Sequence, residues 1–497
     1  MPIPRPEKHL PDALTGRREF LAVAAAAFGS HSACSRREAG ADPSGSRPPN
    51  IVFIMADDLG YGELGCYGQD RIRTPYIDRM AAEGMRFSNA YSGCSVCAPA
   101  RSVLMTGMHM GHTSVRSNPG GVPILAEDVT VAELLRERGY ATGCFGKWGL
   151  GDIGTEGVPW KQGFDEFVGY LHQAHAHYFY PHYIYDNDRQ LALEGNEGDG
   201  RGTYSHDVIA DRALRFIESN KDRPFFCYAP FTIPHAEYIA PDDEIFERYS
   251  GRFEEIELPE NRNRPGRLIR PEQPHATLAA MITRLDRDVG RILRRISDLG
   301  LDGETVVFFT SDNGAAAARW TDYFRSSGAL RGAKGTFYEG GIRVPMLARW
   351  PGRIAAGSRS DHVWGFQDVL ATAVELAGAG GGHATDGISM VPTLLGEGRQ
   401  RRHEYLYWEL PRYVASSGAF RDETPSQGLR MGRWKAVRPV PDGALELYDL
   451  EADPAETTDL AAGNADLVAR IEANLNAART PPRIQRQPAH IWWERKG

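Results

Sequence analysis

The sequence predicts an α/β fold in which a large, mostly parallel sheet is flanked by helices. Four runs of mainly apolar residues, at 51–55, 141–145, 225–229 and 305–310, have the character of strands that are buried on both faces. Polar or charged side chains follow each run within a few residues. Because ligands of parallel α/β sheets bind beyond the carboxyl ends of the strands, these polar residues indicate where the active site lies.

Amphipathic helices are predicted between the strands. Apolar residues recur with i, i+3, i+4, i+7 spacing along one long segment, at Leu278, Met281, Ile282, Leu285, Val289, Ile292, Leu293 and Ile296. Gly300 is a suitable stop for this helix. A second helix is expected to begin with Asp128 as its cap and to run to about Arg138, before Gly139. Strands that alternate with helices in this way favour a parallel sheet.

Length and composition exclude several classes of protein. The 497 residues suffice for two or three domain-sized units, and 41% hydrophobic residues can form a sizeable core. The balance of 57 Lys+Arg against 65 Asp+Glu, a net charge of -8, leaves no global basic footprint for nucleic acid. Six cysteines are too few for a disulfide-built scaffold. We therefore expect a globular protein without a nucleic-acid partner.

The first 34 residues are predicted to be an export signal. Residues 15–21 (TGRREFL) resemble a twin-arginine motif, and the Ala-rich run after them is shorter than the ~20 residues that cross a bilayer. Cys34 is either a lipidated anchor or a residue near an ordinary cleavage site. A frayed helical N-terminus is the alternative for the whole segment. Residues 35–49 form a polar linker, and no later segment is suited to span a membrane. We expect an exported protein of the periplasm or cell envelope.

The strand ends offer oxygen ligands for a metal. Asp57 and Asp58 follow the first strand, and Asp312 and Asn313 follow the run at 305–310. Carboxylate and amide oxygens suit a hard cation such as Ca²⁺ or Mg²⁺ and disfavour zinc. The alternative is that the acidic pairs cap neighbouring helices.

The most specific pattern is CAPARSVLMTG at residues 97–107. It resembles the C-x-P-x-R signature, followed by Thr-Gly, of the formylglycine-dependent sulfatases, an arylsulfatase-like family of the alkaline phosphatase superfamily. The resemblance extends from about residue 50 to residue 464. Further matching stretches are ADDLGYGELGCYG (56–68), GKWGLG (146–151), IPHAEY (233–238), SDNG (311–314), LRGAKGTFYEGGIRVP (330–345), LRMGRWKAV (429–437) and ELYDLEADPAE (446–456).

This resemblance implies the domain organisation and the reaction. An alkaline-phosphatase-like catalytic domain would occupy residues 50–400, a smaller C-terminal α+β subdomain residues 401–480, and a tail residues 481–497. The protein would hydrolyse sulfate monoesters. A separate formylglycine-generating enzyme would oxidise Cys97, and the hydrated aldehyde would supply the nucleophile. Pro99 suits the first turn of a helix, so residue 97 would lie at a helix N-terminus, which favours anions.

The resemblance also implies roles for single residues. Ca²⁺, in preference to Mg²⁺, would be held by Asp57, Asp58, Asp312, Asn313 and the oxygen of the modified Cys97. Arg101 would hold the formylglycine hydrate, Lys147 and Lys334 would bind sulfate oxygens, and His235 would bind sulfate and protonate the leaving alcohol. The ordinary alternatives are solvated surface lysines and a loop histidine without a catalytic role.

Position 149 departs from the family pattern. The family commonly has a histidine in G-K-W-H-L-G where this chain has Gly149. The histidine-rich stretch downstream suggests His175 and His177 as substrate-binding residues or as a replacement base, and His177 is favoured because it adjoins the aromatic run 178–180. The alternative is that Gly149 makes room for substrate or water while both histidines serve packing or sugar binding.

The natural substrate is less well defined. Aromatic and histidine side chains at 170–185 suit a sugar ring, and a sulfated carbohydrate fits an exported enzyme, although a sulfated small molecule or a simple packed insertion is also compatible. Two other functions stay open: a phosphoester or phosphonate hydrolase of the same superfamily, and a non-catalytic glycan-binding protein of the envelope. Cys94 and Cys97 also form a C-x-x-C pair, which is a candidate redox motif.

Overall fold

The computed structural model describes residues 47–484, except for residues 199, 258–271, 317–321, 379–381 and 415–417. The predicted export signal with Cys34, most of the linker and residues 485–497 of the predicted tail lie outside the described residues. Among the described residues, no helix combines the length and the apolar character needed to cross a membrane.

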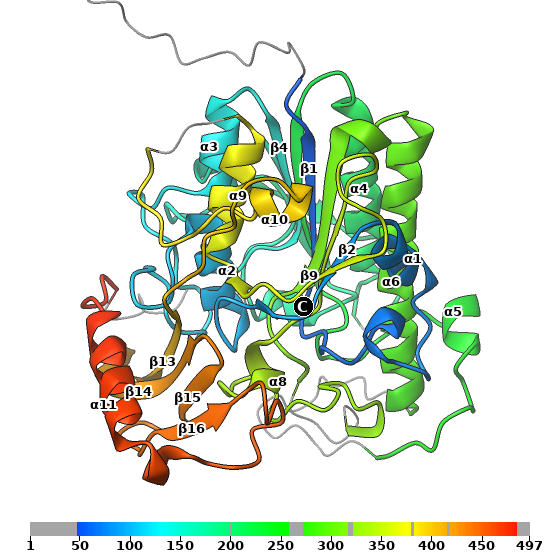
Figure 1. Ribbon diagram of the computed structural model, residues 1–497. Helices are drawn as coiled ribbons and strands as arrows, with labels where there is room; N and C mark the ends of the chain where they lie inside the picture. Colours follow the sequence, from blue (N-terminus) through cyan, green and yellow to red (C-terminus); the bar gives the residue numbers. More distant parts are fainter. Residues whose placement is uncertain are drawn as a thin grey trace, which may run out of the picture. The chain divides into compact units, whose positions relative to one another are not determined.

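A ten-stranded sheet forms the centre of the fold (Figure 1). Its strands are β1 (Asn50–Ala56), β2 (Met85–Phe87), β4 (Ala141–Lys147), β5 (Glu166–Tyr170), β6 (Tyr183–Asp186), β7 (Arg189–Ala192), β8 (Phe225–Pro230), β9 (Thr305–Ser311), β10 (Met346–Arg349) and β11 (Ser358–Ser360). The spatial order is β11-β2-β10-β9-β1-β8-β4-β5-β6-β7. The five strands from β9 to β5 are parallel, and antiparallel pairs occur toward the edges. The predicted mostly parallel sheet is confirmed, and its four predicted apolar runs are the adjacent strands β9, β1, β8 and β4.

Helices cover both faces of this sheet (Figure 1). They are α1 (Pro75–Glu83), α4 (Ser205–Ser219) and α6 (Pro274–Asp298) on one face, and α2 (Cys97–Thr106), α3 (Val131–Glu137), α9 (Asp368–Leu376) and α10 (Val391–Leu395) on the other. Alternate residues of β1 belong to two different hydrophobic clusters: Phe53 packs with the α2 side and Ile54 with the α6 side. β1 is therefore buried on both faces, as its continuous apolar sequence predicts.

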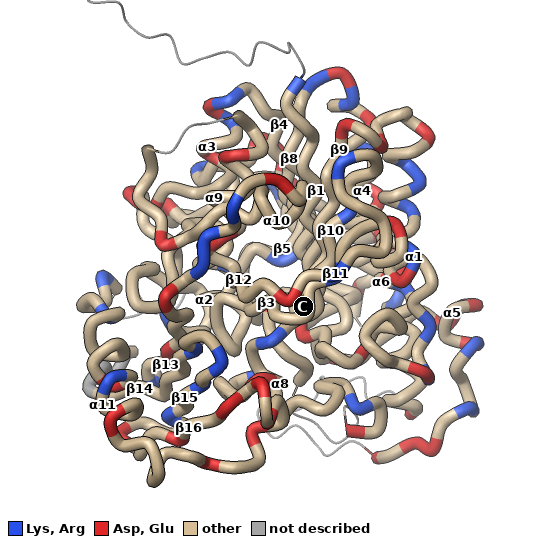
Figure 2. Tube along the Cα trace, viewed as in Figure 1, with Lys and Arg blue, Asp and Glu red and all other residues tan. Residues whose placement is uncertain are grey.

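Charged residues lie mainly on the outer helices and loops, whereas three of the central strands carry none (Figure 2). The sequences of β1, β8 and β9 contain no charged side chain. The acidic groups at the centre of the molecule come from residues that directly follow β1 and β9, namely Asp57, Asp58 and Asp312.

A second, antiparallel sheet contains β13 (Leu406–Val414), β14 (Ala419–Met431), β15 (Trp434–Arg438) and β16 (Glu446–Asp449), with α11 (Ala465–Ala477) close to β14. This confirms the predicted C-terminal α+β part, while the exact domain boundaries stay predictions. The described residues also form shorter elements, among them α5 (Glu244–Glu247), α8 (Glu339–Ile342), and the two-stranded sheet of β3 (Ala90–Tyr91) and β12 (Trp364–Gly365).

Helix α3 begins later than predicted. Its cap is Thr130 and not Asp128: the Thr130 side chain accepts from the Glu133 N–H, and Glu133 accepts from the Thr130 N–H in return. This reciprocal capping box satisfies two backbone donors, those of Glu133 and Thr130. Asp128 instead accepts from the Leu125 N–H at 2.8 Å.

Helix α1 takes its N-terminal cap from another helix. Asp286 of α6 is 1% exposed, and its Oδ1 accepts from the backbone N–H groups of Tyr76 (2.9 Å) and Ile77 (2.7 Å). Thr74, the N-cap residue of α1, supplies no side-chain cap. Asp286 therefore joins α1 to α6.

We predict that Asp286→Ala lowers the free energy of unfolding by about 1–3 kcal/mol, because two backbone donors, one of them buried, lose their acceptor. Urea denaturation provides the measurement. Asp298→Ala on the same helix removes an exposed carboxylate and should change stability by less than about 0.5 kcal/mol. Equal losses in the two variants would contradict the capping role.

The pH dependence of stability adds a second readout. Burial raises the pKa of Asp286 from its ordinary value of 3.8 to about 7. The folded state then holds a proton that the unfolded state releases, so the contribution of this group to stability falls as the pH rises from about 4 to about 7. Asp286→Asn keeps an acceptor oxygen without a charge and should lose this dependence.

Candidate active site

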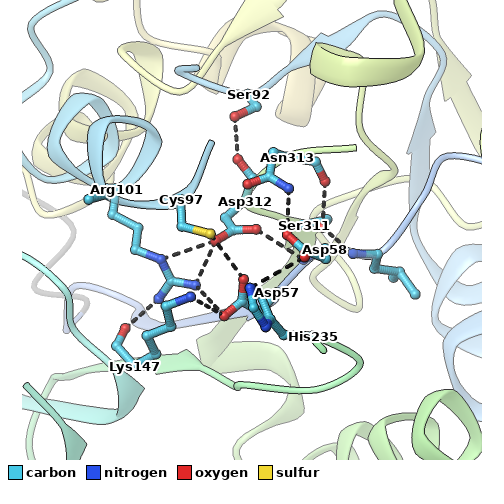
Figure 3. Close-up of polar contacts among 12 residues, drawn as sticks. Asp57, Asp58, Ser92, Cys97, Arg101, Lys147, His235, Ser311, Asp312 and Asn313 are labelled. Atoms are coloured by element: carbon cyan, nitrogen blue, oxygen red, sulfur yellow. Dashed lines mark hydrogen bonds and ion pairs between the residues drawn. The ribbon is translucent and has the colours of Figure 1, made fainter. Parts of the chain in front are cut away.

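Carboxylate and amide groups meet at the carboxyl ends of β1 and β9 (Figure 3). Asp57 and Asp58 follow β1, and Asp312 and Asn313 follow β9; all four are at most 5% exposed. The Asp58 N–H donates to Asp312 Oδ1 at 3.2 Å, and Asn313 Nδ2 donates to Asp58 Oδ1 at 2.8 Å. The structure thus brings the predicted oxygen ligands together.

The register of the two strands produces this meeting. Ala56 lies beside Ser311 in the parallel pair, so the residues that come next on each strand are neighbours. The Asp312 N–H donates to the Ala56 carbonyl at 3.1 Å. Ser311 adds a further bond, because its Oγ accepts from the Leu59 N–H at 2.9 Å and holds the turn after β1.

Helix α2 contributes Cys97 and, one turn later, Arg101. Cys97 is the first residue of α2 and is 1% exposed, and its Sγ lies 3.3 Å from Asp57 Oδ1. Arg101 is fully buried and donates from Nη2 (2.7 Å) and Nε (3.1 Å) to Asp312 Oδ2, and from Nη1 to the Lys147 carbonyl. The signature therefore lies at a helix N-terminus beside the carboxylates, where helix geometry favours an anion.

Two lysines and a histidine complete the cluster. Lys147, the last residue of β4, donates to Asp57 Oδ2 at 2.6 Å. Lys334 comes from the loop before α8 and donates to Asp58 Oδ2 at 2.8 Å. Lys334 Nζ also lies 3.1 Å from His235 Nε2. Neither lysine is a solvated surface charge: Lys147 is fully buried, and the side chain of Lys334 is 19% exposed.

Neighbouring charges set the protonation of this group. Burial, together with the positive charges of Lys334 and Lys147, lowers the pKa of His235 well below its usual value. Burial alone would lower the pKa of Lys334, but the Asp58 carboxylate raises it well above the usual range. His235 Nδ1 faces the Ala236 carbonyl, so a neutral ring donates there and accepts from Lys334 at Nε2.

The two cysteines of the C-x-x-C pair point to different partners. Cys97 contacts Asp57, whereas Cys94 Sγ lies 3.8 Å from the Glu409 carbonyl. Burial raises the pKa of the Cys94 thiol to about 12, and burial with Asp312 and Asp57 also raises that of Cys97. Both cysteines are free thiols. This arrangement disfavours the redox interpretation, which needs an accessible thiolate.

The donor set fits a hard divalent cation. Ligand atoms of Asp57, Asp58, Cys97 and His235 lie within 4.8 Å of one another. The Oδ1 atom of Asn313 is buried and has no hydrogen-bond partner among the described residues, as expected of an oxygen that awaits a cation. Two of these four ligand atoms are carboxylate oxygens, and with Asn313 Oδ1 the oxygens are in the majority, which is the chemistry that Ca²⁺ and Mg²⁺ prefer.

The two histidines that the sequence suggests for substrate binding, His175 and His177, have different surroundings in the structure. His177 lies at the end of a short 3-10 helix (His175–His177), and its ring stacks on His235 with a centroid distance of 4.4 Å and an angle of 29°. His175 is 1% exposed and packs against the rings of Tyr170 and Tyr183, at 4.9 and 5.0 Å. Burial lowers the pKa of His175 to about 3. His177 therefore reaches the cluster, and His175 packs in an aromatic environment.

Two nearby residues were not predicted from the sequence. Asn118 Oδ1 lies 3.4 Å from the Ala98 N–H at the N-terminus of α2. Gln173 places its side-chain amide over Gly149, 2.8 Å from where a Cβ would lie. The sequence pointed to Gln173 only indirectly, because Gly149 has no side chain and so leaves space for a group from another segment.

Comparisons with known proteins agree with the site. Residues 49–379 match the family model described as Sulfatase, and residues 333–480 match the model described as N-sulphoglucosamine sulphohydrolase, C-terminal. Arylsulfatase A of Homo sapiens is 35% identical over 474 residues, covering 84% of this chain and 85% of that protein. N-acetylgalactosamine-6-sulfatase of Canis lupus familiaris is 33% identical over 417 residues, covering 77% and 71%.

Solved structures share the fold. The crystal structure of Ps i-CgsB in complex with k-i-k-neocarrahexaose has a TM-score of 0.72 and 26% identity, and the match covers 88% of this chain and 95% of that one. Phosphonate monoester hydrolase of Agrobacterium radiobacter, with a TM-score of 0.63 and 22% identity over 86% and 95%, shares the fold alone. With the signature on α2 and the cluster beside it, these matches show that the chain belongs to the sulfatase family of sulfate ester hydrolases.

Proposed function

We propose that this sulfatase cleaves sulfate monoesters of a carbohydrate and that residue 97, converted to formylglycine, supplies the nucleophile. The observation that carries the proposal is the position of Cys97: it begins α2 and contacts Asp57, which Lys147 contacts from β4. A sugar substrate is supported by relatives whose names include N-acetylgalactosamine-6-sulfatase, and by the solved structure that holds a neocarrahexaose.

The hydrate of formylglycine offers two hydroxyls on one carbon, one to attack sulfur and one to lose a proton when sulfate leaves. A formylglycine-generating enzyme would be the partner that installs it. The described residues supply the rest of the site. Lys147 and Lys334 bind sulfate oxygens and stabilise their charge, while Arg101, held by Asp312, fixes the geometry around residue 97.

The leaving alcohol needs a proton, and the His235–Lys334 pair is positioned to provide one. Lys334 Nζ is 3.1 Å from His235 Nε2. In this scheme the Lys334 ammonium group transfers a proton to the unprotonated Nε2 of His235, and Nε2 then passes that proton to the alcohol oxygen. Because the ring is neutral at rest, the adjacent ammonium group is what makes His235 an effective donor.

Asp57, Asp58, Asp312 and Asn313, with residue 97, would hold Ca²⁺ in preference to Mg²⁺. When bound, the cation supplies positive charge that activates the nucleophile and offsets the buried carboxylates. For localisation, we propose export through the twin-arginine signal at 1–34 to the periplasm or cell envelope. Cys34 is then either a lipidated anchor or a residue near an ordinary cleavage site.

We predict that Cys97→Ala abolishes turnover of a small aryl sulfate and leaves the fold intact, because the nucleophile is lost and a small buried side chain is replaced. Cys97→Ser should also be inactive in a host without a serine-type maturase. Turnover of the aryl sulfate beside its phosphate analogue distinguishes sulfatase from phosphoesterase activity. An unmodified thiol at position 97, detected by intact-mass analysis of active enzyme, would refute the mechanism.

For the metal, we predict that Asp312→Asn lowers bound Ca²⁺ and reduces kcat/KM by about 100-fold or more, since the substitution removes a ligand charge and the anionic partner of Arg101. Elemental analysis and kinetics give the two readouts. Asp298→Asn is the matched control on an exposed surface and should change neither. Stoichiometric zinc without Ca²⁺ or Mg²⁺ would overturn the assignment.

We further propose that His177 contacts substrate, while any contribution of His175 to substrate binding passes through its tyrosine neighbours. His177→Ala should raise KM for a sulfated sugar several-fold with a small change in stability. His175→Ala should cost about 2–4 kcal/mol of stability, because it leaves a cavity among aromatic rings. Sugar kinetics and thermal unfolding separate the two. If both variants keep wild-type kcat on an aryl sulfate, neither histidine replaces the missing base.

A further inference from the structure

Gln173 lies among three segments that each contact the catalytic cluster. The backbone N–H of Gly149, two residues after Lys147, donates to the Leu171 carbonyl at 3.0 Å. On the other side of Gln173 along the chain, the 3-10 helix carries His177, which stacks on His235.

The third segment begins at Asn118, which contacts the Ala98 N–H beside residue 97. Two residues later, a Cβ built on Gly120 would lie 3.9 Å from Gln173 Cβ. Gln173 thus adjoins segments that contact Lys147, His235 and the start of α2.

Among the described residues, none accepts a hydrogen bond from the amide of Gln173. The residue is 6% exposed, and its Nε2 atom is buried without a hydrogen-bond partner among the described residues. A buried amide donor in this state is unfavourable, so such groups normally bond to ordered water or to a ligand. This donor lies against Gly149, two residues from Lys147, which makes a bound substrate oxygen a suitable acceptor.

Gly149 and Gln173 compete for the same space. A Cβ at position 149 would meet Gln173 Nε2 at 2.8 Å and Cδ at 3.1 Å. Gly149 also has φ +76, a left-handed conformation that L side chains rarely adopt. A side chain at position 149 and the observed position of the Gln173 amide are therefore mutually exclusive.

We propose that the Gln173 amide occupies the place of the side chain missing at Gly149 and donates a hydrogen bond from Nε2 to an oxygen of the bound sulfate group. This inference rests on the proposed function. The acceptor is assigned to sulfate because its oxygens accept only, and because Lys147, the proposed sulfate ligand, is two residues from Gly149. An amide does not take up a proton near neutral pH, so Gln173 binds the sulfate group and is not the base for sulfate release.

Gln173→Met tests the donor while it keeps a side chain of similar length. We expect kcat/KM on a small aryl sulfate to fall by about 10- to 100-fold, the effect of losing a hydrogen bond to a charged group. The inhibition constant for inorganic sulfate should rise several-fold, with thermal unfolding unchanged. The matched control, Gln190→Met, lies on the exposed part of β7 and should leave both constants unchanged.

Two results would overturn the assignment: unchanged constants in Gln173→Met, or a loss restricted to sulfated sugars, which would assign the amide to a sugar hydroxyl. Calorimetric titration with inorganic sulfate measures the same contact without turnover. A failure of the proposed function, seen as a wild-type enzyme that does not hydrolyse the aryl sulfate, is therefore distinguishable from a failure of this inference.

A second experiment uses the competition for space. Gly149→His alone should strongly reduce activity, because the imidazole collides with the Gln173 amide. The double variant Gly149→His/Gln173→Gly removes the obstacle and should be more active than Gly149→His, although the backbone strain at position 149 remains. Additive effects of the two substitutions would show that the positions do not share one space and would contradict the proposal.

Discussion

Three buried carboxylates at the ends of two adjacent parallel strands are the constraint on which the rest of the site depends. Asp57, Asp58 and Asp312 are at most 5% exposed, and each has at least one cationic partner within 3 Å. Desolvating such charges costs several kcal/mol each unless compensating charges are close. The compensation comes from three separate elements: Arg101 on α2, Lys147 at the end of β4, and Lys334 in the loop before α8. The carboxylates can be buried in their charged form only where the fold brings these three elements together. The arrangement that the proposed chemistry needs is therefore also one that stable folding needs.

The C-terminal sheet stabilises the loop that carries Lys334. Glu339, which begins α8 five residues after Lys334, accepts from Lys435 of β15 at 2.8 Å, and its backbone N–H donates to Glu456 at 2.7 Å. Although burial alone would raise it, Lys435 holds the pKa of Glu339 low, so this buried carboxylate stays ionised. Trp408 of β13 adds a bond to the Ser92 carbonyl at 2.8 Å. The second sheet thus fixes the loop that carries Lys334, which gives it a part in the proposed active site although it contributes no proposed catalytic residue.

Most of the fold, and the cluster at its centre, could be predicted from the sequence because the signals are local. The apolar runs became β1, β4, β8 and β9, and the ligand candidates follow two of them directly. The family motif located Cys97 and Arg101 on one helix. The sequence could not predict contacts made by irregular loops, because their residues show no periodic pattern. The stacking of His177 on His235 and the approach of Gln173 to Gly149 depend on how one irregular loop folds. The shift of the α3 cap to Thr130 depends on a reciprocal bond that outcompetes an equally suitable Asp.

On the proposed mechanism, the burial of residue 97 also constrains when formylglycine can be made. Cys97 is 1% exposed and sits behind Asp57, and its thiol pKa is raised by burial and by two carboxylates. In the folded chain this thiol is neither accessible to a second enzyme nor reactive as a thiolate. On the proposed route, conversion to formylglycine must therefore precede closure of α2 onto the strand ends. Folding would follow modification, and an export route that carries folded proteins, as the twin-arginine signal implies, would then preserve the order. The burial of residue 97 that shields it in the folded enzyme thus also requires, on this route, that the conversion to formylglycine take place before folding.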